Sequence, residues 1–175
     1  MVKLFPTLAA FMAINRGIAE AETISRFGTN GLNDKADAFR HAYFNALNTR
    51  SATLAVVGDG AKVVRRFGEA HETEVPSQLQ LEVQMDLHNN EVGIQYCSDC
   101  YPGFTTDQTI SNGIMQLLLN GSLNYLFPTL PPPFFSDGTP NPNGDPNFYG
   151  ANGTNDLQTA THGITSSTQI IPTNQ

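Results

Sequence analysis

Residues 34–47 read DKADAFRHAYFNAL, which combines an apolar helical pattern with an unusual number of polar side chains. Asp37, His41 and Asn45 follow one another at intervals of four residues, so they line one face of a helix, with Arg40 beside them. A helix that buries one face rarely carries so many polar groups there without a use for them. We therefore expect this helix to contribute to a polar site between helices. The alternative is a surface row with an Asp37–Arg40 ion pair, worth only about 0.3 kcal/mol.

Apolar residues recur at steps of three and four residues on both sides of this stretch, which predicts helices throughout the first 127 residues. We expect helices at residues 7–27, about 34–49, about 51–71 and about 78–96, and a fifth that begins at Thr105 or Thr106. Asn33 or Asp34 is the expected cap of the second helix, and Ser51 that of the third. Gly58 and Gly60 weaken the middle of the third helix, so a break is expected to be tolerated there.

The composition changes after residue 127, where Pro, Gly, Asn and Asp replace the apolar pattern. This composition is typical of irregular backbone and disfavours helices and sheet ladders. Large apolar residues, among them Phe134 and Phe148, indicate that the segment packs on the helices. We therefore predict an all-α fold: a compact bundle of about five helices in residues 1–127, with an irregular extension in residues 128–175 wrapped over it.

Charge and cysteine content restrict the range of partners and ligands. Sixteen acidic residues against nine basic ones give a net charge of −7, which argues against nucleic acids and anionic membranes as partners. No stretch is uniformly apolar over the length of a transmembrane helix. The only cysteines are Cys97 and Cys100, so a site with four cysteine ligands is excluded. A disulfide or an unused thiol pair is favoured over a metal role for them.

A second polar block is GEAHE, at residues 68–72 near the predicted end of the third helix. His71 could serve as a base or a metal ligand, and Glu72 as a general acid/base. The alternative is a favourable cation at the helix end beside a solvated acid. The block is not the H-E-x-x-H motif of zinc proteases, because Val75 stands where the second histidine would be.

A third block, MDLHNNEVG at residues 85–93, places Asp86, Asn89, Asn90 and Gly93 on one helix face. Two adjacent asparagines are costly inside a helix, so their side chains are expected to bond to another helix or to a ligand. A glycine on the same face would permit a neighbour to approach closely. The alternative is a buried hydrogen-bond network that only fixes the register of the helices. His88 points away from this face and is expected to be an ordinary surface histidine.

If the three helices converge, they form one site with several possible chemistries. Its members would be Asp37, Arg40, His41, Asn45, His71, Glu72, Asp86, Asn89 and Asn90. Such a site could hold one divalent metal ion, with His41, His71, Asp86 and His162 as candidate ligands. His162 would reach it only if the irregular extension folds back, and otherwise it is a solvated loop residue. The site could equally run metal-free acid/base hydrolysis. The sequence contains no G-x-S-x-G, G-x-G-x-x-G or G-x-x-x-x-G-K-[ST] motif.

At these three blocks the chain resembles an uncharacterised bacterial domain family. Its marks are D-A-F/Y-R-H-x-x-W/F-N/S-x-x, then A-H-E, then M-D-L-x-N-N-x-x-G, and they match residues 37–47, 70–72 and 85–93. Phe44 stands where tryptophan is usual. Similar domains occur in secreted or lipid-anchored bacterial proteins and at the C-termini of RHS-type polymorphic toxins. The resemblance implies a secreted or cell-surface location, membership of a larger secreted protein or assembly, and a hydrolytic effector activity. It assigns no catalytic role to any residue.

The hypothesis from the sequence is an exported hydrolase with lipid or cell wall as its substrate. His41, oriented by Asp37, would be the general base or a metal ligand, and Glu72 its acid/base partner. Arg40 and the asparagines would bind the substrate and its developing negative charge. The rival hypothesis is a non-enzymatic secreted binding or structural module whose polar cluster is a buried hydrogen-bond network. A metal-binding module without catalysis is a third reading.

Overall fold

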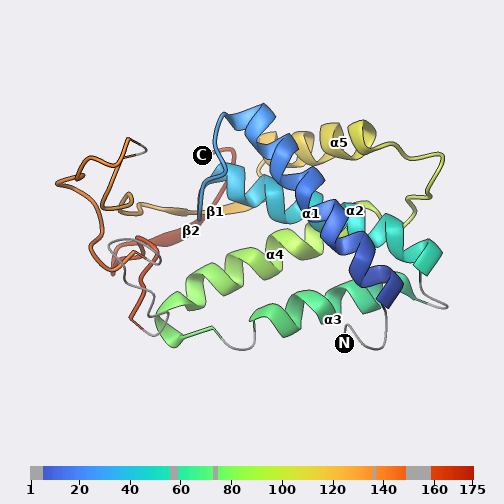
Figure 1. Cartoon of the computed structure of the whole chain (residues 1–175), viewed down its shortest axis with the longest axis horizontal. Coiled ribbons are helices and arrows are strands. Elements are labelled where there is room, and N and C mark those ends of the chain that lie inside the picture. Colours follow the sequence, from blue (N-terminus) through green and yellow to red (C-terminus); the bar gives the residue numbers. More distant parts are fainter. Residues whose placement is uncertain (1–5, 56–58, 73–74, 136, 149–158) are drawn as a thin grey trace.

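The computed structural model describes residues 6–55, 59–72, 75–135, 137–148 and 159–175 (Figure 1). This part of the chain folds into a bundle of five α-helices: α1 (Pro6–Phe27), α2 (Lys35–Ala55), α3 (Gly60–Glu72), α4 (Gln80–Tyr96) and α5 (Asp107–Leu119). A short 3-10 helix, η1 (Ser77–Leu79), precedes α4. The predicted helical fold class is therefore confirmed. None of the described helices is both long and apolar enough to cross a bilayer.

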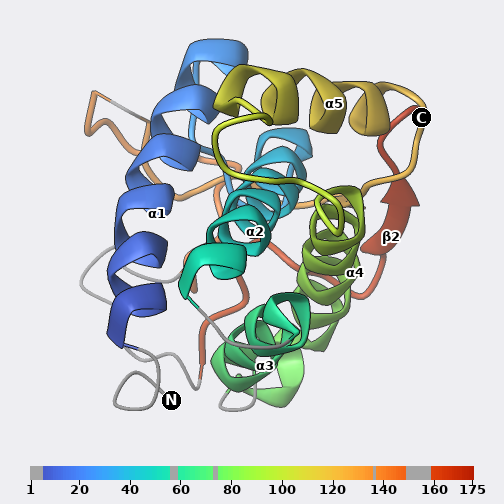
Figure 2. The ribbon, with the colours of Figure 1, turned by 90° about the vertical axis from the view of Figure 1, so that its right-hand side faces the viewer.

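Helix α2 is the centre of the bundle. It contacts α1, α3, α4 and α5, and Figure 2 shows it enclosed by the other four. Thirteen of its 21 residues are buried, so its polar row lies in the interior and not on the surface. Phe39 and Tyr43 pack into the main core with Ile110 and Ile114 of α5. Because polar groups buried in this way need partners, the row must be satisfied by side chains from neighbouring helices.

The expected caps form at α2 and α5. A carboxylate oxygen of Asp34 accepts a hydrogen bond of 2.9 Å from the backbone N–H of Asp37, which satisfies a free donor in the first turn of α2. Thr106 does the same for Thr109 at the start of α5. The start of α2 therefore follows from the sequence alone, and it fixes where the polar row begins.

Ser51 does not cap a third helix, which corrects the boundary expected from the sequence. It lies inside α2, which continues to Ala55, and its hydroxyl accepts a hydrogen bond of 3.1 Å from Asn15 of α1. The next helix starts instead at Gly60, where Asp59 accepts from the backbone N–H of Lys62. Ser51 is not a cap because the helix continues through it, and its bond to Asn15 joins two helices, which no local sequence pattern reveals.

Helix α4 approaches α2 very closely at Gly93. A β-carbon added to Gly93 would lie 2.0 Å from the carbonyl oxygen of Ala42 and 2.8 Å from its carbonyl carbon. Only glycine permits this spacing, as the sequence suggested. Because Ala42 follows His41 directly, the close approach sets how near the polar side chains of α4 come to the row on α2.

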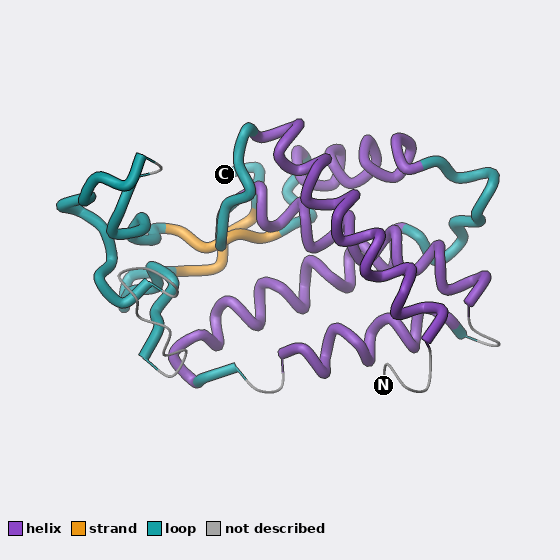
Figure 3. Tube along the Cα trace, viewed as in Figure 1, coloured by secondary structure: helices purple, strands orange, loops and turns teal. Residues whose placement is uncertain are grey.

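Two short strands join the C-terminal segment to the bundle, and the sequence did not predict them. β1 (Asn124–Phe127) pairs antiparallel with β2 (Gln169–Pro172), with Tyr125 opposite Ile171. Most of the described chain after β1 is loop, gathered at one end of the molecule (Figure 3). The expected irregular segment is thus present, but it lies at one end of the bundle and is anchored by a two-stranded ladder. The division into residues 1–127 and 128–175 stays a prediction.

A disulfide closes the turn that follows α4. Cys97 and Cys100 are bonded to each other, and both are buried. Their sulfurs are therefore not metal ligands, in agreement with the interpretation favoured from the sequence.

Candidate functional site

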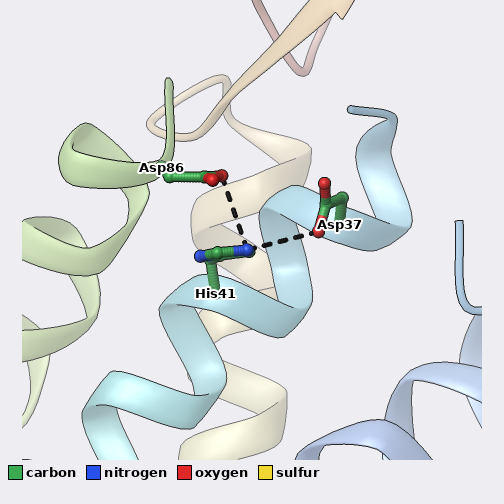
Figure 4. Close-up of side chains that lie close together, drawn as sticks. All are labelled: Asp37, His41 and Asp86. Carbon is green, nitrogen blue, oxygen red and sulfur yellow. Dashed lines mark ion pairs between the residues drawn. The ribbon is translucent and has the colours of Figure 1, made fainter. Parts of the chain in front are cut away.

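Helices α2 and α4 bring together three ionisable side chains, Asp37, His41 and Asp86, which we call the Asp–His–Asp cluster. Nε2 of His41 lies 3.4 Å from an Oδ1 atom of each aspartate. Figure 4 shows the ring of His41 on α2 with its nitrogen directed at both carboxylates. The side chains of Asp37 and Asp86 are 1% and 8% exposed, whereas that of His41 is 20% exposed. The histidine therefore connects two buried carboxylates to the surface.

The other ring nitrogen of His41, Nδ1, contacts Asn90, and Asn45 holds Asn90 in place. These bonds determine which ring nitrogen carries the hydrogen. Nδ2 of Asn45 donates to the backbone carbonyl of His41 at 3.0 Å, so the atom facing that carbonyl must be the amide nitrogen. The same nitrogen donates to Oδ1 of Asn90 at 2.6 Å. This oxygen lies 3.1 Å from Nδ1 of His41 and can only accept, so Nδ1 is the protonated nitrogen. In the neutral ring, the lone pair of Nε2 then faces the two carboxylates.

Asp37 is held by groups from two directions besides His41. The backbone N–H of Asn33 donates to its Oδ2 at 2.6 Å, and Nη2 of Arg40 forms an ion pair with its Oδ1. The same Arg40 nitrogen donates to the carbonyl of Gly31. Although burial raises the pKa of Asp37, the charges of His41 and Arg40 and the N–H of Asn33 lower it below its ordinary value. Asp37 is therefore ionised at neutral pH.

The two carboxylates set the charge of His41. Although burial lowers the pKa of His41, the negative charges of Asp86 and Asp37 raise it to about 10. The nearby charge of Arg40 opposes this rise but does not cancel it, so the ring is protonated at neutral pH. Nε2 thus has to carry a positive charge, because a bare lone pair facing two carboxylates would be strongly repelled.

A cleft of about 440 Å³ opens beside the cluster. His41, Arg40, Asn45 and Asn90 form its polar side. The rest of its lining comes from Met12, Arg16, Ala19, Glu20, Phe44, Phe67 and Gly68. A smaller pocket of about 200 Å³ shares Asn45, Gly68 and Asn90 with it. A ligand in the larger cleft would contact His41 directly, while Asp37 and Asp86 lie behind the ring.

Most of the candidate residues from the sequence are brought together here. Asp37, Arg40, His41, Asn45, Asp86 and Asn90 form one connected group. Asn89 does not join it. Its amide donates to the carbonyl of Asn124 and accepts from the N–H of the same residue, both at 2.9 Å, so it fastens α4 to β1. His71 and Glu72 belong to α3, but their side chains lie outside the described residues.

The remaining two histidines lie apart from the cluster. Nδ1 of His162 is 2.7 Å from Oε2 of Glu82, and the pair is nearly buried. His162 does fold back onto the helices, but it binds Glu82 and not the cluster. Its carbonyl also accepts from the side chain of Asn33 at 3.2 Å. His88 is exposed and contacts the carbonyl of Ser122, as expected for a surface histidine.

Asn33 is the residue whose importance the sequence concealed. Its backbone N–H binds Asp37, and its side chain donates to Glu82 and to the carbonyl of His162. It has φ of 62°, a left-handed conformation that asparagine tolerates better than most residues. The sequence identified Asn33 only as a helix cap. A long-range role of this kind depends on where the C-terminal segment folds, which no local pattern reveals.

Among the described residues, the Asp–His–Asp cluster is a group of side chains that could hold a metal ion. Asp37, His41 and Asp86 each offer one ligand atom, and these atoms lie within 4.8 Å of one another. His41 and Asp86 were among the metal candidates from the sequence. Asp37 joins them, and His162 is instead engaged by Glu82. The arrangement can therefore provide either proton transfer or metal ligation.

Comparison with known proteins assigns the chain to a family. A family model described as "Domain of unknown function (DUF6973)" matches residues 2–122, which include the whole Asp–His–Asp cluster and both asparagines of the cleft. No curated protein and no solved structure gives a match. Since the family model covers more than half of the sequence, the chain belongs to the DUF6973 family of domains of unknown function.

Proposed function

We propose that this chain is a hydrolase domain, with the Asp–His–Asp cluster as its reactive centre and the adjoining cleft as its substrate site. The observation that carries the proposal is His41, which contacts two buried carboxylates on one side and lines the cleft on the other. Burying two like charges beside each other is costly, and functional sites are where such costs are commonly found.

Hydrolysis needs a base to activate water and positive charge to stabilise the oxyanion that forms. The imidazolium of His41 supplies positive charge at the wall of the cleft, and the carboxylates of Asp37 and Asp86 behind the ring keep it protonated. A protonated His41 cannot act as the general base expected from the sequence. Asp37 and Asp86 lie behind its ring, so a carboxylate base has to come from the lining of the cleft, where Glu20 is the candidate. Arg40 also lines the cleft, and its buried Nε has no hydrogen-bond partner among the described residues. Its guanidinium would stabilise the developing negative charge.

The lining of the cleft favours a lipid-like ester over a cell-wall glycan. Met12, Ala19, Phe44 and Phe67 provide apolar contacts beside the polar groups around His41 and the charged pair Arg16 and Glu20. A glycan would need polar partners along its whole length, whereas an acyl ester needs them only around its carbonyl. The resemblance to domains of secreted lipoproteins and polymorphic toxins supports an exported protein, part of a larger secreted assembly, that meets lipid substrates.

A panel of chromogenic substrates tests the proposal. It would contain 4-nitrophenyl acyl esters of increasing chain length, a phosphate monoester, a phosphate diester and an anilide. We expect hydrolysis of acyl esters, with longer chains preferred. His41→Asn should lower kcat/KM by about 100-fold or more, the scale of one acid/base group. The matched control is His88→Asn, which alters an exposed histidine of α4 and should leave the rate unchanged.

Two outcomes would overturn the hydrolase proposal. One is the absence of hydrolysis across the panel by protein whose circular dichroism shows it folded. The other is a His41→Asn variant that keeps the rate of the His88→Asn control.

A further inference from the structure

We propose that the Asp–His–Asp cluster binds one divalent transition-metal ion, with Nε2 of His41 and one carboxylate oxygen each from Asp37 and Asp86 as its ligands. The inference deepens the proposed function, because it occupies the same centre, and its catalytic meaning rests on that proposal. Metal binding itself can be measured without any substrate.

The first argument is the orientation of the His41 ring. Metal-ligating histidines almost always donate their second N–H to a fixed acceptor, which leaves the other nitrogen free to bind the ion. Here Oδ1 of Asn90 accepts from Nδ1, and Asn45 holds that amide in place from the other side. Asn45 is fixed in turn by the carbonyl of His41. These bonds direct Nε2 at the two carboxylates, and an ion bound there would displace the Nε2 proton to solvent and take its lone pair.

The second argument is distance. Nε2 lies 3.4 Å from both carboxylate oxygens, beyond the usual 2.7–3.2 Å range of an N–H···O bond. In a tetrahedral site with bonds of about 2.1 Å, however, neighbouring ligand atoms are about 3.4 Å apart. All three ligand atoms lie within 4.8 Å of one another, so a small rotation of the carboxylates would place them around one ion.

The third argument is charge and access. Two carboxylates neutralise the two charges of a divalent ion, and the imidazole favours zinc, iron or cobalt over magnesium or calcium. Three protein ligands leave a fourth position, as in catalytic zinc sites. His41 also lines the cleft, so an ion bound to this ring would lie close to a substrate held there.

The His162–Glu82 pair combines the same residue types at a shorter spacing. Its nitrogen and oxygen are 2.7 Å apart, the length of a direct hydrogen bond. Asn33 donates to the same Glu82 oxygen. This pair is closed by hydrogen bonds, while the Asp–His–Asp cluster is spaced for ligation.

The test uses the full chain after treatment with a chelator and removal of the chelator. Calorimetric titration with Zn²⁺ should show one ion per chain. Titration with Co²⁺ should give the strong visible absorption of a four-coordinate ion. His41→Gln and Asp86→Asn should each weaken Zn²⁺ binding by at least about 100-fold, and Asn90→Ala, which keeps all three ligands, by about 10–100-fold. The matched control His88→Gln should bind Zn²⁺ as the parent chain does.

Thermal melts confirm that each variant is folded before it is titrated, and Asn90→Ala keeps the test decisive if a ligand variant fails to fold. The inference is overturned if the parent chain binds no ion, or if His41→Gln and Asn90→Ala bind Zn²⁺ as tightly as His88→Gln.

Activity separates this inference from the proposed function. Ester hydrolysis that proceeds equally with and without metal, in a chain that binds none, would overturn the metal site and leave the hydrolase standing. A single ion bound at the cluster with no hydrolysis on the panel would support the metal site and overturn the hydrolase.

Discussion

Replacement of Gly93 by alanine should both destabilise the protein and disturb the cluster. The new β-carbon would lie 2.0 Å from the carbonyl oxygen of Ala42, whereas ordinary contacts begin at 3.4 Å. The obstructing atom is backbone, so α2 and α4 must move apart by more than an ångström. Overpacking of this kind costs about 1–3 kcal/mol, and a backbone obstacle places Gly93→Ala at the upper end. At this chain length, about 3 kcal/mol corresponds to a fall in Tm of about 6–12 °C.

The chain provides a control with the same chemical change and the opposite expected sign. Gly17 lies exposed within α1, and a β-carbon added there would meet nothing within 4 Å. Gly17→Ala should raise the free energy of unfolding by about 0.5–1 kcal/mol, because alanine is the better helix former. Urea denaturation of both variants measures the difference. Equal stabilities for Gly93→Ala and Gly17→Ala would refute the reasoning about helix spacing.

The separation of the two helices should also reach the site. Asn90 is three residues before Gly93 on α4, and its oxygen lies 3.1 Å from Nδ1 of His41. If α2 and α4 move apart by more than an ångström, Asn90 and His41 move with their own helices, and the hydrogen bond between them is broken. Gly93→Ala should therefore weaken Zn²⁺ binding, while Gly17→Ala leaves it unchanged. Unchanged Zn²⁺ affinity in Gly93→Ala would mean that the spacing of the helices does not control the cluster.

Three further outcomes are expected. In chelator-treated protein, the raised pKa of His41 contributes stability that is complete below pH 6.5 and is lost as the pH rises toward about 10, and the lowered pKa of Asp37 contributes stability that is lost in acid. Urea melts across this pH range should show both declines. A free energy of unfolding that stays flat from pH 7 to 10 would contradict the assigned charge of His41. Asn89→Ala should cost about 2 kcal/mol by releasing the backbone of Asn124, with Zn²⁺ affinity intact, as calorimetry can check. His162→Ala should lower stability by about 1.5–3 kcal/mol in urea melts and expose the C-terminal segment to limited proteolysis, and resistance equal to the parent would argue against anchoring.

Much of the helical architecture could be predicted because local chemistry determines it. The cap at Asp34 and the polar row from Asp37 to Asn45 depend only on helical periodicity. The α4 contribution could be predicted in kind, since paired asparagines in mid-helix require partners elsewhere. What periodicity could not show is which partner each one takes. Asn90 turns to His41, while Asn89 turns to the backbone of a strand that the sequence did not predict.

The errors share one physical cause, which is that tertiary bonds override local preference. Ser51 has the chemistry of a cap, but Asn15 of another helix occupies its hydroxyl. β1 and β2 are four residues each, and β1 leads directly into a proline-rich stretch, so neither has enough pattern to be recognised. Asn33 contributes to the site through residues 49 and 129 positions away in the sequence. Contacts between residues so far apart depend on the folded topology, and no local sequence pattern predicts them.

Asn33 depends on contacts with residues that lie after the end of the family match. The family match ends at residue 122, yet Asn33 is held by the carbonyl of His162, and its own carbonyl receives the N–H of Leu126. A fragment cut at the family boundary would keep every member of the Asp–His–Asp cluster but lose both of these braces. A chain of this family that ended at that boundary would need another segment to make these two contacts with the residue that precedes α2.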